Sequence, residues 1–153
     1  IGAFVANLKL AEEISGYATS VLGASVLAQR AAMAGLRVKG TWMEEVRRIN
    51  SLNQARLAAV CRQLGFKLPV YPSNANFLVI ETLEAGVRPE ALVACCKDAG
   101  IMIRQGTYHT EKFGDRFVKV STTVPTEWVE LFCEQLPSLV DAARKRNFVE
   151  AQF

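Results

Sequence analysis

The segment that specifies the sheet of this chain begins with Tyr-Pro-Ser-Asn-Ala-Asn-Phe-Leu-Val-Ile-Glu at positions 71–81. It continues, after a helical segment, with Gly-Ile-Met-Ile-Arg-Gln-Gly at 100–106 and, beyond a polar loop, with Asp-Arg-Phe-Val-Lys-Val-Ser-Thr at 115–122. Each run is rich in β-branched and aromatic residues and is bounded by turn-forming residues, which is typical of strands. The sequence therefore predicts strands over 76–81, 101–104 and 117–123 that present polar groups at their ends.

The neighbouring segments complete an α+β unit. A short strand is expected over 66–70, a helix from Pro89 in its first turn to a left-handed stop at Gly100, and a terminal helix capped by Thr126. Pro137 is expected to kink or divide that last helix. Its predicted inward set is Trp128, Phe132, Leu136, Leu139, Val140 and Ala143. The order β, β, α, β, β, α predicts a mainly antiparallel sheet covered by helices, preceded by connecting helices.

The upstream third reads differently. Residues 1–6 predict a buried strand, which is an unusual beginning because a lone strand must pair with something. Asn7 is expected to cap a helix with Leu10, Ile14 and Tyr17 on one face. Small residues dominate from 18 to 35, so we expect this part to pack closely against a larger partner.

A long helix is predicted to connect the two parts. Thr41 and Glu44 have the spacing of a capping box, and Gly65 is expected to end the helix. The predicted buried face is Leu57, Val60, Cys61 and Leu64. The side expected to face water is Arg47, Arg48, Asn50, Asn53 and Arg56.

Composition narrows the functional classes. The chain has 153 residues, half of them hydrophobic, and a net charge of +3. It shows no basic stripe interleaved with aromatic residues, so we expect no nucleic-acid partner. The apolar run at 21–36 is too short and too interrupted to span a bilayer, so we expect no membrane partner. The four cysteines and the single histidine lack metal-ligand spacing, so we expect reduced thiols used as apolar fillers, a cytoplasmic protein and no metal site.

The series Ala-Asn-Phe at 75–77, Gly-x-x-x-Arg at 100–104 and Phe-Val-Lys-Val-Ser at 117–121 resembles the C-terminal region of fold-type I pyridoxal-phosphate enzymes. The resemblance is to the class I and II aminotransferases, most closely the histidinol-phosphate aminotransferase branch. It implies that residues 1–40 end a large cofactor domain, that 41–65 form a connecting helix, and that 66–153 form the small domain. It also implies a homodimer acting on an amino acid and a 2-oxo acid.

The resemblance implies substrate-binding roles for Arg104, Lys119 and Asn76. Arg104 matches the arginine that lies near the substrate, and Lys119 stands where the family has an arginine that binds the substrate α-carboxylate. A lysine keeps the positive charge but loses the planar fork, so selectivity for a carboxylate should weaken. Three alternatives stay open at position 119: Lys119 binds the carboxylate less well, Arg104 or Arg116 has taken over its role, or the substrate is unusual. The residues alone also allow a purely structural interpretation. Arg104 can be a surface arginine, and Lys119 can be a solvent-facing lysine on an edge strand. Asn76 reads equally as an ordinary turn residue.

The family's cofactor, pyridoxal 5′-phosphate, requires a Schiff-base lysine, an acidic partner and phosphate donors. In the family these come from the larger domain, and Lys9 matches an ordinary residue at a helix start. We therefore assign no catalytic or cofactor-binding residue and expect this chain alone to be inactive. Two alternatives stay open. The enzyme could be a decarboxylase of a phosphorylated amino acid, since the loop at 105–116 resembles threonine-phosphate decarboxylases, or the chain could be a non-catalytic α+β ligand-binding module.

Overall fold

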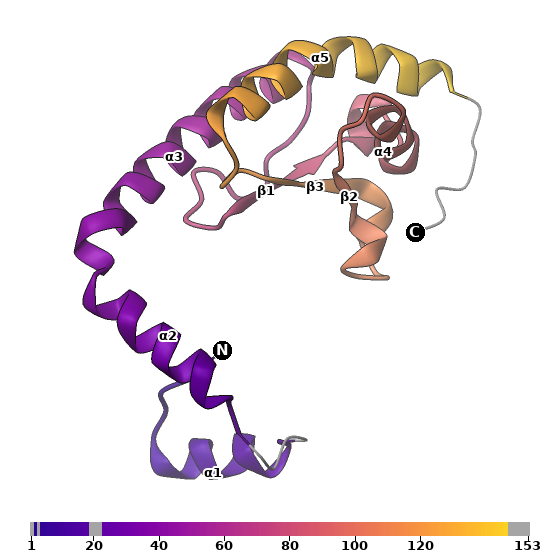
Figure 1. Cartoon of the computed structure of the whole chain (residues 1–153). Coiled ribbons are helices and arrows are strands. Elements are labelled where there is room, and N and C mark those ends of the chain that lie inside the picture. The colour runs from indigo at the N-terminus through magenta and orange to yellow at the C-terminus, as the bar shows by residue number, and fades with distance from the viewer. Residues whose placement is uncertain (1, 3, 19–22, 147–153) are drawn as a thin grey trace. The chain divides into compact units, whose positions relative to one another are not determined.

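A computed structural model describes residues 2, 4–18 and 23–146 of the chain (Figure 1). Its contacts divide into two compact units, Ile1–Glu44 and Glu45–Phe153, and the boundary falls within helix α3 (Lys39–Gln63). We describe each unit by itself.

The first unit contains two helices that bury none of their residues. Helix α1 (Leu8–Gly16) begins as predicted, because Asn7 Oδ1 accepts a hydrogen bond from the Leu10 amide at 3.0 Å. Helix α2 (Val26–Arg37) follows. The strand predicted over 1–6 is wrong for the part of it that the structure describes, since residues 4–6 are not in a strand and Val5 is fully exposed. The physical reason is that no described segment offers these residues a backbone partner. Ile1 and Ala3 lie outside the described residues.

Helix α3 differs from its prediction in two ways. It begins at Lys39, and the Thr41 hydroxyl donates back to the Val38 carbonyl oxygen at 2.7 Å, so the predicted capping box is wrong. The predicted apolar face and the stop are confirmed, because Leu57 and Cys61 are fully buried and Gly65 has a φ of +78°.

The sheet has three antiparallel strands in the order β1–β3–β2. These are β1 (Phe77–Glu81), β2 (Arg104–Gln105) and β3 (Phe117–Ser121). The strand predicted over 66–70 is reduced to one bridge between Lys67 and Glu81. The strand predicted over 101–104 begins only at Arg104, so this residue opens the strand and does not close it. The predicted α+β class, a small antiparallel sheet with helices, is confirmed.

The core lies on one face of this sheet. Leu78 and Ile80 of β1, with Val118 and Val120 of β3, point into a single cluster of buried residues. Helices α4 (Pro89–Asp98) and α5 (Thr126–Lys145) lie on that side together with α3 (Figure 1). Their contributions to the cluster include Leu92, Cys96, Leu136, Val140, Leu57 and Cys61. Among the described residues of this unit, no α-helix covers the opposite face of the sheet (Figure 1).

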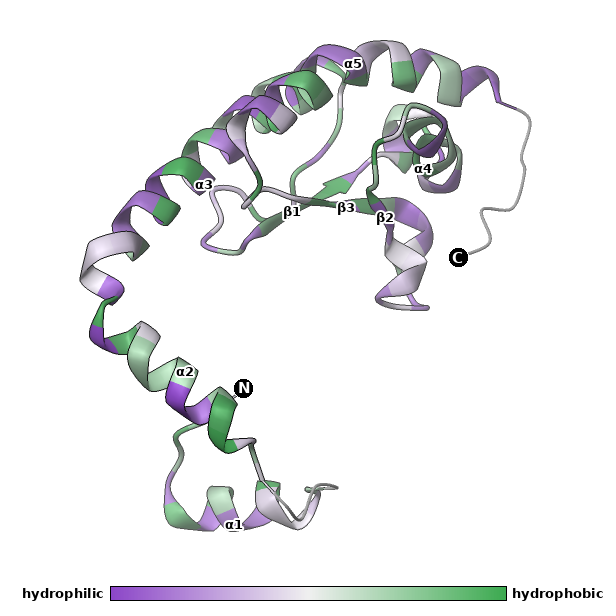
Figure 2. Cartoon of the chain, viewed as in Figure 1, coloured by the Kyte–Doolittle hydropathy of each residue, from purple (hydrophilic) through white to green (hydrophobic). Residues whose placement is uncertain are grey.

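Helix α5 buries a stripe that differs slightly from the predicted one. Val129 is 4% exposed, whereas Trp128 is 62% exposed. The buried residues Val129, Phe132, Leu136, Val140 and Ala143 follow one another at helical spacings of three or four. Hydrophobic and hydrophilic bands alternate along this helix in Figure 2. Pro137 does not divide it, and its N-cap is Pro125, so the prediction of a Thr126 cap is wrong.

All four cysteines are free thiols within or against the core, as predicted. Cys61 and Cys96 are fully buried, and Cys133 is half-buried. Burial, with a smaller contribution from a neighbouring thiol, raises the pKa of Cys61 and that of Cys96 to about 12. Among the described residues, no helix combines the length and the apolar character needed to cross a membrane.

Candidate anion-binding site

The open face of the sheet carries the candidate site. Strand alternation buries Val118 and Val120 under the helices, so Lys119 between them lies on the opposite face and is half-buried. β3 is the central strand of the sheet, with a neighbour on each side. The reading of Lys119 as a residue on an edge strand is therefore wrong.

Arg104 is the direct cross-strand neighbour of Lys119. The register pairs Arg104 of β2 with Lys119 of β3, and pairs Lys119 on its other side with Val79 of β1. Like charges directly opposite each other destabilise a sheet by about 0.2–1 kcal/mol. Within residues 23–146, neither cation forms an ion pair with a carboxylate. The sheet thus holds two positive charges side by side without an internal counter-charge.

Aromatic rings hold both cations in place. The ammonium nitrogen of Lys119 lies 4.1 Å from the centre of the Phe77 ring. The guanidinium carbon of Arg104 lies 4.7 Å from the centre of the Tyr108 ring. Each contact is a cation–π interaction, which fixes the position of the charge without neutralising it. The arrangement is suited to an anion that approaches from the open face.

His109 belongs to the same neighbourhood. Its ring meets the Tyr108 ring edge-on, with the ring centres 5.1 Å apart. Partial loss of contact with water lowers the pKa of His109, and repulsion from Lys119 and Arg104 lowers it further. The sequence predicts a substrate-specificity element in the loop 105–116, which contains His109, because this loop joins two strands that each end in a basic residue. The structure places His109 close enough to Arg104 and Lys119 for both charges to act on it.

The other two predicted site residues lie elsewhere. The guanidinium group of Arg116 is 3.0 Å from a Glu81 carboxylate oxygen and 3.3 Å from one of Glu84. Lys67 also pairs with Glu84, so these four side chains form a neutralised cluster. Asn76 is exposed, and its carbonyl oxygen accepts from the Thr122 amide at 2.9 Å. The structure therefore brings Arg104 and Lys119 together. Arg116 instead forms ion pairs with Glu81 and Glu84.

A buried polar network anchors the sheet to helix α3. The Thr122 hydroxyl donates to Asn50 Oδ1 at 2.6 Å, and Asn53 Nδ2 donates to the Thr122 and Val124 carbonyl oxygens at 3.0 and 3.1 Å. Gln54 Nε2 donates to the Ala75 carbonyl oxygen at 2.8 Å. Because Thr122 ends the strand of Lys119 and Ala75 precedes that of Phe77, this network fixes both strands at one end.

The prediction that Asn50 and Asn53 face water is thus wrong, since they are 7% and 0% exposed. Asn50, Asn53 and Gln54 share the helical stripe that continues into Leu57 and Cys61. The signal was the position of these residues on that stripe. These residues were predicted to face water because they are polar. Polar side chains are buried where they have hydrogen-bond partners, such as Thr122 here.

Two glycines close the loop that carries Tyr108 and His109. A β-carbon on Gly106 would lie 2.4 Å from the Gly114 carbonyl oxygen, and one on Gly114 would lie 2.3 Å from the Thr107 amide nitrogen. The two backbone segments therefore approach each other more closely than any residue with a side chain permits. This contact fixes the base of the loop beside Arg104.

Neither of two clefts beside the sheet has the full set of groups that bind pyridoxal phosphate. Such a site needs a lysine, an acidic partner for the ring nitrogen and donors for the phosphate, gathered in one cavity. The cleft that contains Lys97 is lined by no carboxylate, and the cleft that contains Glu81 is lined by no lysine. Within the described ranges, no cluster of histidine, cysteine and acidic residues could hold a metal ion.

Comparisons with known proteins identify the family. Residues 1–136 match the family model for aminotransferase class I and II. The chain therefore belongs to the class I and II aminotransferase family.

A solved structure supports the fold. The chain resembles the crystal structure of an aminotransferase from Mycobacterium tuberculosis, with a TM-score of 0.57 and 18% sequence identity. The match covers 64% of this chain and 26% of that protein, so the matched part spans about a quarter of its relative's length. No curated protein matches the chain.

Proposed function

We propose that this chain is the C-terminal part of a pyridoxal-phosphate-dependent aminotransferase of the histidinol-phosphate aminotransferase type. In this proposal Arg104 and Lys119 bind the carboxylate of an amino acid or a 2-oxo acid. The observation that carries it is the opposed pair Arg104 and Lys119, which has no carboxylate partner among residues 23–146. Membership of the aminotransferase family supports the choice of an organic acid as the ligand.

The division of labour follows from what this chain contains. The cofactor would supply the electron sink on which amino groups are exchanged, and it would be held by parts of the enzyme other than the residues described here. Residues 1–40 would end the cofactor domain, 41–65 would connect, and 66–153 would form the small domain. Arg104 and Lys119 would orient the acid, and the loop with Tyr108 and His109 would screen it from water.

Lysine at position 119 alters the expected selectivity. An arginine can make two parallel hydrogen bonds to a carboxylate, whereas an ammonium group acts as a point charge. Here Arg104 provides the planar group and Lys119 adds charge. We expect the pair to accept both carboxylates and larger anions. That breadth favours a second candidate, a decarboxylase whose substrate carries a phosphate group, because two cations facing one anion suit a dianion.

Titration with inorganic sulfate tests the binding proposal directly. Amide resonances of residues 104–109 and 119 are followed by NMR in the 153-residue chain at low ionic strength. We expect saturable shifts that are lost in Lys119→Met and in Arg104→Met. Lys112→Met is the matched control, because Lys112 also lies over an aromatic ring, that of Phe113, at 5.3 Å.

Equal weakening by all three substitutions would mean that only net charge matters, and the proposal would be wrong. Acetate and phosphate monoesters, titrated in the same way, separate the two kinds of anion that the pair could hold. Tighter binding of acetate supports a carboxylate held by Arg104 and Lys119, and tighter binding of the monoester supports a substrate whose phosphate group is held there.

We further propose that the enzyme is a homodimer and that it is located in the cytoplasm. The free state of all four cysteines supports the cytoplasmic location. The protein that joins this chain to its cofactor domain should show the visible absorption of a lysine-bound pyridoxal phosphate. It should sediment as a dimer and transfer an amino group in a coupled assay. A colourless protein, after incubation with the cofactor, would contradict the enzyme proposal and leave a binding module.

A further inference from the structure

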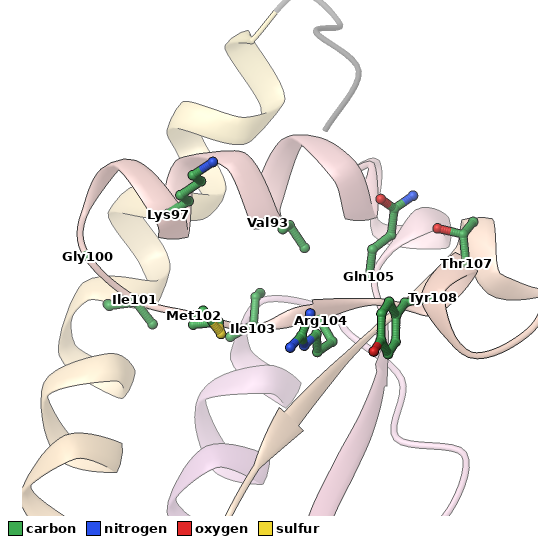
Figure 3. Close-up of a pocket in the computed structure, with 10 residues that line it drawn as sticks. All are labelled: Val93, Lys97, Gly100, Ile101, Met102, Ile103, Arg104, Gln105, Thr107 and Tyr108. Carbon is green, nitrogen blue, oxygen red and sulfur yellow. The ribbon is translucent and has the colours of Figure 1, made fainter. Parts of the chain in front are cut away.

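A cleft of about 340 Å³ lies beside the candidate anion site (Figure 3). One wall comes from helix α4, where Val93 is directed toward the cleft. The opposite wall is the segment 100–103 that leads into β2, and one end is formed by Arg104 and Tyr108. Lys119 does not line it. Arg104 therefore stands between the open sheet face on one side and the cleft on the other.

The lining is mostly apolar, and it carries one cationic residue toward each end, Lys97 and Arg104 (Figure 3). Val93, Ile101, Met102 and Ile103 supply hydrocarbon surface. The polar residues of the lining are Lys97, Arg104, Gln105, Thr107 and Tyr108, and no carboxylate is among them. Binding sites for small organic molecules commonly have this size and composition. The lining offers a ligand two cationic side chains and no carboxylate, which favours an anion over a cation.

We propose that the cleft receives the apolar body of a carboxylic acid whose carboxylate is held by Arg104 and Lys119. This inference rests on the proposed function and deepens it, because it assigns the substrate to the acids with a large aliphatic or aromatic side chain. Small or doubly acidic substrates would leave the hydrocarbon walls exposed to water. The Tyr108 ring, which stacks on the Arg104 guanidinium, forms the boundary between the charged and the apolar part of the site.

The test compares three probes on the 153-residue chain by NMR titration. 3-Phenylpropionate carries both features, acetate has only the carboxylate, and 3-phenylpropanol has only the apolar body. We expect 3-phenylpropionate to bind at least about tenfold more tightly than either of the others, which corresponds to about 1.4 kcal/mol. Equal affinities of 3-phenylpropionate and acetate would overturn the inference. So would equal affinities of 3-phenylpropionate and 3-phenylpropanol.

A variant that fills the mouth of the cleft locates the binding. Thr107 is exposed and lines the cleft, so Thr107→Trp should fold normally and obstruct it. We expect it to abolish the advantage of 3-phenylpropionate over acetate. Thr123→Trp is the matched control, because Thr123 is also exposed but does not line the cleft.

The two proposals fail in different ways. An unchanged advantage of 3-phenylpropionate in Thr107→Trp would place its phenyl group elsewhere and overturn the inference. Sulfate binding that depends on Lys119 would in that case still support the anion site. Sulfate binding that is insensitive to Lys119→Met would overturn the proposed function itself, and the inference with it.

Discussion

Arg104 of β2 lies directly opposite Lys119 of β3, and each cation rests against its own aromatic ring. In a sheet this juxtaposition is unfavourable by itself. The two aromatic residues that contact these cations, Phe77 and Tyr108, bring no negative charge to the pair. In the cluster around Arg116, by contrast, Glu81 and Glu84 neutralise the guanidinium group. The pair Arg104 and Lys119 and the single Arg116, which directly precedes β3, thus have opposite electrostatic surroundings, and only the pair is prepared for an external anion.

Replacing Lys119 by arginine should strengthen carboxylate binding, because a planar guanidinium group can donate two parallel hydrogen bonds to a carboxylate. In Lys119→Arg we expect acetate to bind about fivefold more tightly, the equivalent of one added hydrogen bond of about 1 kcal/mol. Sulfate should change less, because charge alone governs much of its attraction. NMR titration measures both affinities. Lys112→Arg, made in the outer part of the loop, should leave them unchanged, and an equal gain there would contradict the assignment.

The pKa of His109 should report the charge of its neighbours. Because repulsion from Lys119 and Arg104 lowers this pKa, Lys119→Met should raise it toward the ordinary value of 6.5, without reaching that value because the loss of hydration remains. NMR titration of the imidazole resonances gives the measurement. An unchanged pKa in Lys119→Met would show that the two side chains do not sense each other.

The same coupling makes anion binding depend on pH. An anion between the cations raises the pKa of His109, so binding takes up a proton. Sulfate affinity should therefore increase as the pH falls through the His109 pKa, which lies below 6.5, and should level off once the ring is protonated. His109→Asn should remove the pH dependence while it preserves sulfate binding at neutral pH.

The buried network predicts a large effect from a nearly isosteric change. Thr122→Val removes the hydroxyl that donates to Asn50 Oδ1 and leaves this buried oxygen without a donor. We expect a loss of about 1–3 kcal/mol in the free energy of unfolding, measured by urea denaturation. Thr123→Val, one residue further and exposed, should stay within about 0.5 kcal/mol. Similar values for the two variants would mean that the network contributes little.

Much of the second unit could be predicted from local pattern. Alternation placed Leu78, Ile80, Val118 and Val120 on one face and Lys119 on the other, and the glycines at 65 and 100 ended their helices with positive φ. These features depend on the residue and its near neighbours. For the same reason the α+β class followed from the order of the segments.

What could not be predicted depends on contacts between distant residues. The order β1–β3–β2, which makes β3 central and sets Arg104 opposite Lys119, cannot be derived from the period of single strands. Nor could the burial of Asn53, because its partners at Thr122 and Val124 are about seventy positions away. The Arg116 cluster was hidden likewise, since Glu81 and Glu84 precede it by more than thirty residues.

The cysteines should differ in reactivity according to their burial. Since the pKa of Cys61 and that of Cys96 are raised to about 12, almost no thiolate is present at pH 8, and both should resist a thiol reagent in the folded chain. Cys133, which is half-buried, should react before them. Peptide mapping after brief labelling measures the order, and labelling in urea shows that all sites are reactive once unfolded. Rapid modification of Cys61 in the folded chain would contradict its place in the core.

The contact between Gly106 and Gly114 should be intolerant of any side chain. In Gly106→Ala the added carbon would lie 2.4 Å from the Gly114 carbonyl oxygen and 2.8 Å from the Phe117 ring, so the backbone must separate. We expect the free energy of unfolding to fall by about 1–3 kcal/mol, which is typical of overpacking. Sulfate binding should also weaken, because Tyr108 moves away from Arg104. Gly35→Ala in α2 is the control, since nothing lies within 4 Å of its added carbon and alanine favours a helix. Normal stability with sulfate affinity intact in Gly106→Ala would show that the loop base adapts without cost to the site.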